Sequence, residues 1–119
     1  MANTLTYQTG ITFRTDDFVW SLQPTSVELA MGSKMQADRV TATFAAAITI
    51  ALGEVTAPTV AYFHNADATN FVTITDDATF LAKIPAGRTV CLNLAGTETL
   101  KAQADTADCL LDYALFEEA

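Results

Sequence analysis

The chain has 119 residues, half of them hydrophobic, with 14 acidic and 6 basic side chains and a net charge of −8 at pH 7. This length suits one domain whose core needs no metal or disulfide, and the composition is not that of a disordered chain. The six basic residues are scattered, whereas nucleic acids and anionic membranes are bound by clustered Lys and Arg. We therefore expect neither nucleic acid nor membrane as a partner.

The sequence predicts no membrane span and no secretory leader. The longest apolar stretch, residues 44–52, is interrupted by Thr49 and is too short to cross a bilayer as a helix. No basic segment followed by an apolar one opens the chain. We expect the protein to work in the cytoplasm, or in a particle assembled there.

The N-terminal third predicts short strands separated by turn residues. Residues 5–14 are rich in Thr, and Gly10 among them is typical of a bulge. Residues 18–22 form a second strand that ends before Pro24, and residues 26–31 form a third that ends at Gly32.

The clearest strand signal is residues 40–52, which alternate with a period of two. One face carries Val40, Ala42, Phe44, Ala46, Ile48, Ile50 and Leu52, and the other carries Thr41, Thr43, Ala45, Ala47, Thr49 and Ala51. A straight strand of this length would reach roughly 40 Å at about 3.3 Å per residue. We expect it to bend or to be shared between two sheets.

Further strands follow at spacings near ten residues, at 59–64, 70–75, 79–84, 89–94, 98–103 and 109–116. Residues 100–116 also show helical spacing, but alternation favours strands there. Regular short strands with turns between them predict an all-β fold, an antiparallel β-sandwich of jelly-roll type that forms a single domain over residues 1–119. The expected core is Phe13, Val19, Val40, Phe44, Ile48, Ile50, Val60, Tyr62, Val72, Ile74, Leu92, Leu94, Leu111, Tyr113 and Leu115.

The two cysteines are expected to be free thiols. Alternation places Cys91 on the face opposite Val90, Leu92 and Leu94, whereas Cys109 shares the core-facing set of its strand. Side chains on opposite faces cannot bring their Cβ atoms within disulfide range.

Candidate catalytic groups all have simpler explanations. His64 and Asp67 could form an acid–base pair, but no nucleophile motif accompanies them, and a strand-end imidazole beside a turn explains both residues. The acidic pairs at residues 16–17, 76–77 and 117–118 are typical of solvated turns and a tail. The glycines are isolated and form no phosphate-binding loop. We expect no enzymatic activity and no catalytic residues.

The loop at residues 65–70 offers oxygen ligands from Asn65, Asp67 and Asn70, which is the chemistry that calcium prefers. The loop lacks the spacing and the bidentate Glu of a calcium-binding loop, and turn formation explains the same residues. We expect no metal and no cofactor.

An uncharged surface is the main candidate for a binding function. Thr41, Thr43, Ala45, Ala47 and Thr49 would share one face of the predicted strand. One interpretation is a solvated outer face. The other is a flat interface, because monomers usually place Lys or Glu on such surfaces to block association.

Several stretches together resemble small virion proteins of tailed bacteriophages. They are the start at residues 5–7, the aromatic–polar hairpin at 62–74 (YFHNADATNFVTI), the turn at 81–88 (LAKIPAGR) and the ending at 110–118 (LLDYALFEE). The resemblance covers about half of the chain and implies a jelly-roll-like sandwich that assembles as an oligomer on a capsid or at the head–tail region. It implies no catalytic residue.

The expected function is therefore that of a phage capsid decoration (cement) protein, a homo-oligomer, expected as a trimer, that bridges major capsid subunits. The alternatives are a head–tail connector, tail or fibre component, or a carbohydrate- or ligand-binding module. The last would be favoured by exposed aromatic side chains in a groove, and Trp20 is the only tryptophan.

Overall fold

The computed structural model describes residues 3–118, without the side chains of residues 23–25. These residues form nine strands and no helix. In chain order the strands are β1 (Asn3–Arg14), β2 (Val19–Ala42), β3 (Ile48–Thr49), β4 (Val60–Asn65), β5 (Val72–Asp76), β6 (Thr79–Ile84), β7 (Thr89–Asn93), β8 (Leu100–Ala104) and β9 (Cys109–Glu118).

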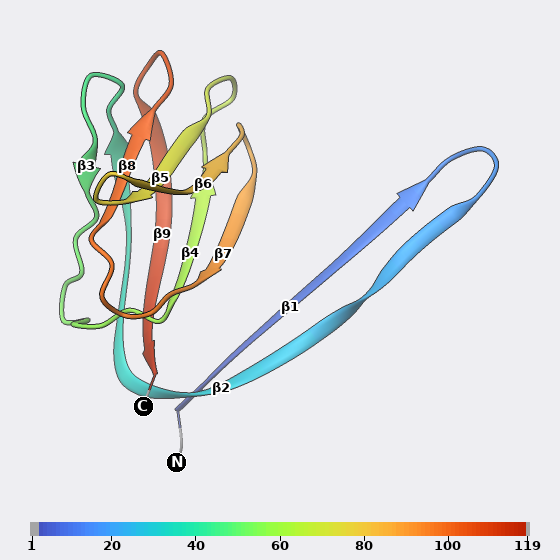
Figure 1. Ribbon diagram of the computed structural model, residues 1–119, viewed down its shortest axis with the longest axis horizontal. Coiled ribbons are helices and arrows are strands. Elements are labelled where there is room, and N and C mark those ends of the chain that lie inside the picture. Colours follow the sequence, from blue (N-terminus) through green and yellow to red (C-terminus); the bar gives the residue numbers. More distant parts are fainter. Residues whose placement is uncertain (1–2, 119) are drawn as a thin grey trace.

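Two antiparallel sheets pack face to face as a sandwich (Figure 1). One sheet has the strand order β1-β2-β9-β4-β7, and the other has the order β3-β8-β5-β6. Strands β2 to β9 pair as a long hairpin folded on itself: β2 pairs with β9, β3 with β8, β4 with β7 and β5 with β6. Two further pairs, β4 with β9 and β5 with β8, complete the two sheets. This is the arrangement of a jelly roll. The predicted all-β sandwich is confirmed.

The core lies between the two sheets and is apolar. Its fully buried side chains include Phe63, Val72, Ile74, Ile84, Leu100, Ala102, Leu111 and Leu115. The segment at residues 100–116, which also had helical spacing, forms β8 and β9, so its strand prediction is confirmed.

Strand β1 and the first half of β2 form a long hairpin that stands away from the sandwich (Figure 1). We call residues 3–31 the arm. The strands predicted at 18–22 and 26–31 are one continuous strand here, because Gln23 and Pro24 form a bulge opposite Gly10. A bulge tolerates proline without ending the strand. The arm makes the molecule extended, with a radius of gyration of 15.8 Å against about 13.5 Å for a compact chain of this length.

The prediction of one unbroken strand over residues 40–52 is wrong. Strand β2 ends at Ala42, residues 43–47 turn, and β3 joins the other sheet. The Thr43 hydroxyl donates to the Ala46 carbonyl at 2.7 Å, and the Phe44 amide donates to Asp108 Oδ1 at 3.2 Å. The chain therefore crosses from one sheet to the other here, which agrees with the expectation that so long a segment would bend or be shared between two sheets.

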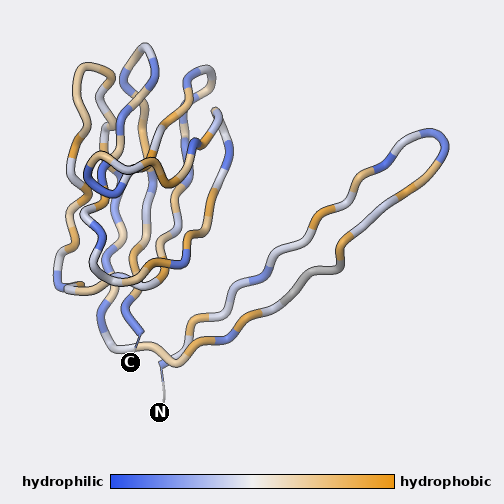
Figure 2. Tube along the Cα trace, viewed as in Figure 1, coloured by the Kyte–Doolittle hydropathy of each residue, from blue (hydrophilic) through white to orange (hydrophobic). Residues whose placement is uncertain are grey.

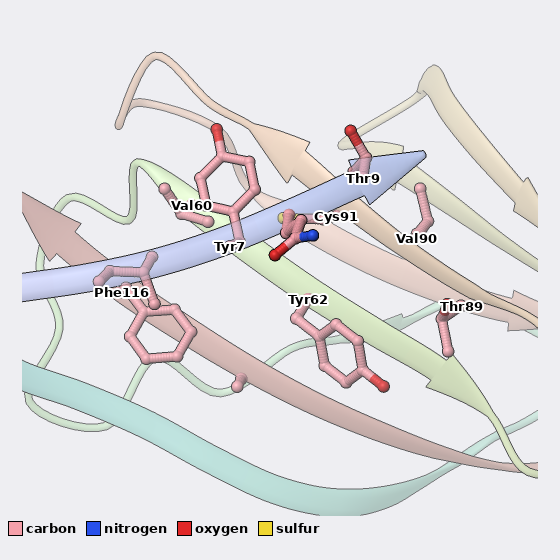
Figure 3. Close-up of a pocket in the computed structure, with 11 residues that line it drawn as sticks. Tyr7, Thr9, Val60, Tyr62, Thr89, Val90, Cys91 and Phe116 are labelled. Atoms are coloured by element: carbon pink, nitrogen blue, oxygen red, sulfur yellow. The ribbon is translucent and has the colours of Figure 1, made fainter. Parts of the chain in front are cut away.

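Four residues of the predicted core are exposed instead. Phe13 and Val19 lie on the arm, Phe44 lies in the crossing turn, and Tyr62 lies on the outer face of β4. In β4 the inward set is Ala61, Phe63 and Asn65, one residue out of step with the prediction. Val60 is buried although its parity points it outward, because the base of the arm covers it (Figure 3).

Candidate assembly interface

The arm has one mostly apolar face, which Thr9 interrupts near its middle. Directly paired residues of an antiparallel hairpin point to the same side, and the register pairs Leu5 with Leu29, Tyr7 with Val27, Ile11 with Leu22 and Phe13 with Trp20. Near the sandwich these side chains are half-buried, whereas Ile11, Phe13, Trp20 and Leu22 are 52–61% exposed. Figure 2 shows apolar positions along both strands of the arm.

The other face of the arm is mostly polar. Its described pairs are Thr4 with Ala30, Thr6 with Glu28, Gln8 with Ser26, Thr12 with Ser21 and Arg14 with Val19. The arm is thus an amphipathic ribbon, although water surrounds both faces near its tip.

The tip of the arm is a closed turn. The Thr15 amide donates to the Phe18 carbonyl at 2.8 Å, and the Thr15 hydroxyl oxygen accepts from the amides of Asp17 and Phe18. The Phe18 ring lies 6.0 Å from the Phe13 ring, centroid to centroid. Local hydrogen bonds and ring packing therefore fix the turn that places Asp16 and Asp17 at the far end.

The outer face of the five-stranded sheet carries a second apolar surface. Cross-strand register aligns its side chains in rows, of which the first holds Met35, Phe116, Val60 and Asn93 and the second holds Ala37, Ala114, Tyr62 and Cys91. We call these two rows the outer strip. Its described side chains are uncharged, and Met35 and Tyr62 are 51% and 40% exposed.

The base of the arm and the outer strip enclose a groove of about 480 Å³ (Figure 3). Leu5, Tyr7 and Thr9 line it from β1, and Tyr62, Cys91 and Phe116 are among the residues that line it from the sheet. The Tyr7 hydroxyl donates to Asn93 Oδ1 at 3.1 Å and ties the base of the arm to β7. The groove opens between the arm and the sheet, and both of its walls are largely apolar.

A charged row borders the outer strip. Arg39 donates from Nε to Asp112 Oδ1 at 2.6 Å and from Nη2 to Oδ2 at 3.0 Å, and His64 Nδ1 lies 3.2 Å from Asp112 Oδ2. The hydrogen bonds from Arg39, reinforced by that of His64 and by both charges, lower the pKa of Asp112 to about 2. Arg39 remains 54% exposed along its side chain, and the carboxylate of Asp112 balances its charge within the row.

The acid–base pair considered for His64 and Asp67 does not form. His64 faces Asp112 on the outer face, whereas Asp67 Oδ2 accepts the amides of Thr69 and Asn70 at 3.0 and 2.7 Å. The hydrogen bonds from these two amides lower the pKa of Asp67, and the bond from the Asn70 amide has the larger effect. Both side chains thus have structural partners.

The loop at residues 65–70 is organised by hydrogen bonds of its own. Asn65 is fully buried, donates from Nδ2 to the carbonyls of Asn70 and Ile84 at 2.8 and 2.9 Å, and accepts the Asp67 amide at 2.9 Å. Within the described part of the chain, no three His, Cys, Asp or Glu side chains gather in a way that could hold a metal ion. The ligands considered for calcium are thus used to shape the turn.

The acidic pairs occupy a turn, a hairpin and the end of a strand. Asp16 and Asp17 are exposed at the arm tip, and Asp77 forms an ion pair with Lys101 at 3.0 Å. Glu117 Oε1 accepts from the Thr56 hydroxyl and from the Ala57 amide, both at 2.7 Å, and these bonds lower the pKa of Glu117.

The predicted facing of the two cysteines is confirmed. Cys91 lies on the outer face in the groove, and Cys109 is 1% exposed in the core. Both thiols are free, and burial raises the pKa of each.

The five residues predicted as a Thr/Ala interface do not share one flat face. Thr41 pairs with Leu110 on the outer face of the five-stranded sheet, whereas Thr49 pairs with Lys101 in the other sheet and points away from the core. Thr43, Ala45 and Ala47 lie in the crossing turn, where Ala45 and Ala47 are exposed. A contact role for these residues remains a prediction.

The apolar faces described here were missed at the sequence level, although part of the signal was present. Leu5, Tyr7, Ile11 and Phe13 lie at alternate positions of one strand, and Val27, Leu29 and Met31 lie at alternate positions of the next. Alternation reveals that one face is apolar, but it does not reveal whether that face meets the chain's own core or projects into solvent.

Comparisons with known proteins add no relatives: no family model, no curated protein and no solved structure matches this chain. Over residues 3–118 there is no helix long and apolar enough to cross a membrane.

Proposed function

We propose that this protein is a non-enzymatic structural subunit of a tailed-phage particle, and that it acts as a capsid decoration protein. In this role it self-associates, as a trimer on the shell, and bridges major capsid subunits. Its action is adhesive: apolar and hydrogen-bonded contacts across the seams between subunits stabilise the head.

The observation that carries this proposal is the projecting arm. A two-stranded hairpin is at best marginally stable by itself in water, and this one exposes four large apolar side chains on one face. Such an element gains stability when a neighbouring subunit covers it. An arm on a rigid sandwich is therefore suited to linking subunits.

Most of the segments that resemble virion proteins form the sandwich, and only residues 5–7 lie at the base of the arm. Residues 62–74 run from β4 into β5, residues 81–88 join β6 to β7, and residues 110–118 form β9. The resemblance supports a virion body, and the arm supplies the means of attachment.

A head–tail connector, tail or fibre component is the alternative within the same class, because an adhesive arm suits those positions equally. The observation that bears on a carbohydrate-binding module is the exposed Trp20 beside Phe13. Sugar recognition also needs polar groups placed around an aromatic ring, whereas the neighbours of Trp20 on this face include Ile11 and Leu22.

Cryo-electron microscopy of purified particles from the source phage tests the proposal. We expect jelly-roll density on the outside of the head, at sites repeated by the icosahedral symmetry, and the chain in the particle's protein profile. Density at the neck or tail would favour the alternative and contradict decoration of the head. Absence of the chain from purified particles would overturn the virion assignment.

A further inference from the structure

We propose that the arm of one copy binds the outer strip of a second copy, with Ile11, Phe13, Trp20 and Leu22 seated in that copy's groove. This inference names the mating surfaces of the self-association in the proposed function, and it rests on that self-association. The two surfaces lie on the same chain, so every copy that presents an arm also presents a groove for one.

The surface area of the protein supports contact with a partner of matching size. The accessible surface is 7287 Å², whereas a compact monomer of 12.7 kDa exposes about 6,200 Å². The excess of about 1,000 Å² is near the roughly 800 Å² that each partner buries in a stable interface. Figure 1 shows the arm projecting from the sandwich, and such a projection adds accessible surface.

The apolar patch at the arm tip is of the size that binding sites commonly have. Large apolar side chains carry about 200 Å² each, so four of them at 52–61% exposure present roughly 400 Å² on one face. The largest apolar patch of a monomer has this order of size, and it is often the site at which the protein binds a partner.

The groove is a receptor of matching chemistry. Its lining includes the short side chains of Ala114 and Cys91 and the rings of Phe116 and Tyr62. Figure 3 shows Cys91, Phe116 and Tyr62 beside the base of the arm. A β-ribbon with an apolar face can lie flat against such a surface. The chain's own arm forms one wall of the groove through Leu5, Tyr7 and Thr9, and its tip stands away from the sheet (Figure 1).

The charged residues near the two surfaces favour a second copy of this chain as the partner of the arm. A chain of net charge −8 repels its own copies, so a stable contact must keep acidic groups apart or meet them with basic ones. The arm tip carries exposed Asp16 and Asp17, and exposed Arg88 lies beside the charged row, in which Arg39 is already paired with Asp112. An arm lying along the outer strip brings its acidic turn toward Arg88.

The groove contains a native thiol, which permits a direct cross-linking test. Phe13→Cys places a thiol on the apolar face of the arm, about 13 Å beyond Thr9 and out of reach of the chain's own Cys91. Thr12→Cys is the matched control, since it lies next in sequence on the opposite face. Both are made with Cys109→Ser, and a short bismaleimide is added near neutral pH, where maleimides react with thiols in preference to lysine amines. The incubation is long, because burial raises the pKa of Cys91 and lowers its thiolate fraction.

We expect Phe13→Cys to give covalent oligomers, Thr12→Cys to give at least ~10-fold less, and Cys91→Ser to abolish the product. Equal cross-linking by both thiols, or none by Phe13→Cys, would overturn the proposed contact.

A second experiment measures association without added thiols. Ile11→Thr together with Trp20→Thr should weaken self-association by at least ~30-fold in sedimentation velocity, because central apolar anchors dominate interfaces. Thr12→Lys together with Ser21→Lys, on the opposite face, should leave it within a few-fold. Unchanged association in the first variant, or a monomeric parent at high concentration, would overturn the inference.

The proposed contact and the proposed function fail separately. A monomeric chain that still binds particles through its arm would refute the contact between copies and leave the virion assignment in place. A chain that associates through its arm but is absent from particles would do the opposite.

Discussion

Adjacent residues in β4 provide a sharp test of which face is the core. Phe63 is fully buried and Tyr62 is 40% exposed on the outer face. Truncating a buried Phe to Ala costs about 3–5 kcal/mol, from the lost transfer energy and from the cavity that remains. Phe63→Ala should therefore lower the free energy of unfolding by about 4 kcal/mol, whereas Tyr62→Ala should lower it by about 1 kcal/mol or less.

Urea denaturation followed by far-ultraviolet circular dichroism measures both variants. With a slope near 2 kcal/mol per molar urea, the midpoint of Phe63→Ala should fall by about 2 M. Both variants are compared at one low protein concentration, where self-association contributes least. Equal losses, or a larger loss for Tyr62→Ala, would refute the facing of β4 and the placement of the groove on the outer side.

Three further expectations concern the turn, the charged row and the thiols. Asn65→Ala should lower the free energy of unfolding by about 2–4 kcal/mol, because it leaves buried carbonyls without donors. Added calcium should not restore the melting temperature of this variant, and restoration would establish a metal site. Asp112→Asn should cost about 1 kcal/mol or less at pH 7, since the pair with Arg39 is partly exposed. The pKa of Asp112 is lowered on folding from 3.8 to about 2, so its contribution is present above about pH 4 and is lost between about pH 4 and pH 2; a difference from the parent protein that persists at pH 2 would contradict this. In the folded protein, maleimide should label Cys91 well before Cys109, with two labels in denaturant; the reverse order, or a single label in denaturant, would count against the assigned facing.

The sandwich was predictable because its strands alternate and its turns carry the usual residues. Val72, Ile74, Leu111 and Leu115 lie in the core as their alternation predicts. The facing of both cysteines followed from the same rule.

Errors arose where parity alone does not decide between two faces. In β4 both Tyr62 and Phe63 are aromatic, so either set could have faced inward. Phe63 packs against the core, and the arm covers Val60 from the outside. Each of the two alternating sets of residues in β4 therefore contains a buried side chain. Long-range contact decides the matter, and local sequence does not report it.

The arm could not be foreseen for a similar reason. Phe13 and Val19 have the composition of core residues, and nothing local distinguishes a hairpin that packs on its own sandwich from one that leaves it. The departure occurs near Gly32, where β2 passes from the arm into the sandwich and a Cβ atom would lie 3.3 Å from the Glu117 carbonyl oxygen. Gly32 was expected to end a strand, and it instead lies where the chain changes direction within one.

The central claim, that the arm is an assembly element, is tested most directly by the fluorescence of Trp20. This is the only tryptophan, and it lies 52% exposed on the apolar face of the arm, so the unmodified protein reports whether that face is covered. We predict emission typical of a solvated indole in dilute solution, and a shift to shorter wavelength as the concentration rises and copies assemble. Emission that stays at the solvated wavelength at every concentration, and also in assembled particles, would contradict the account.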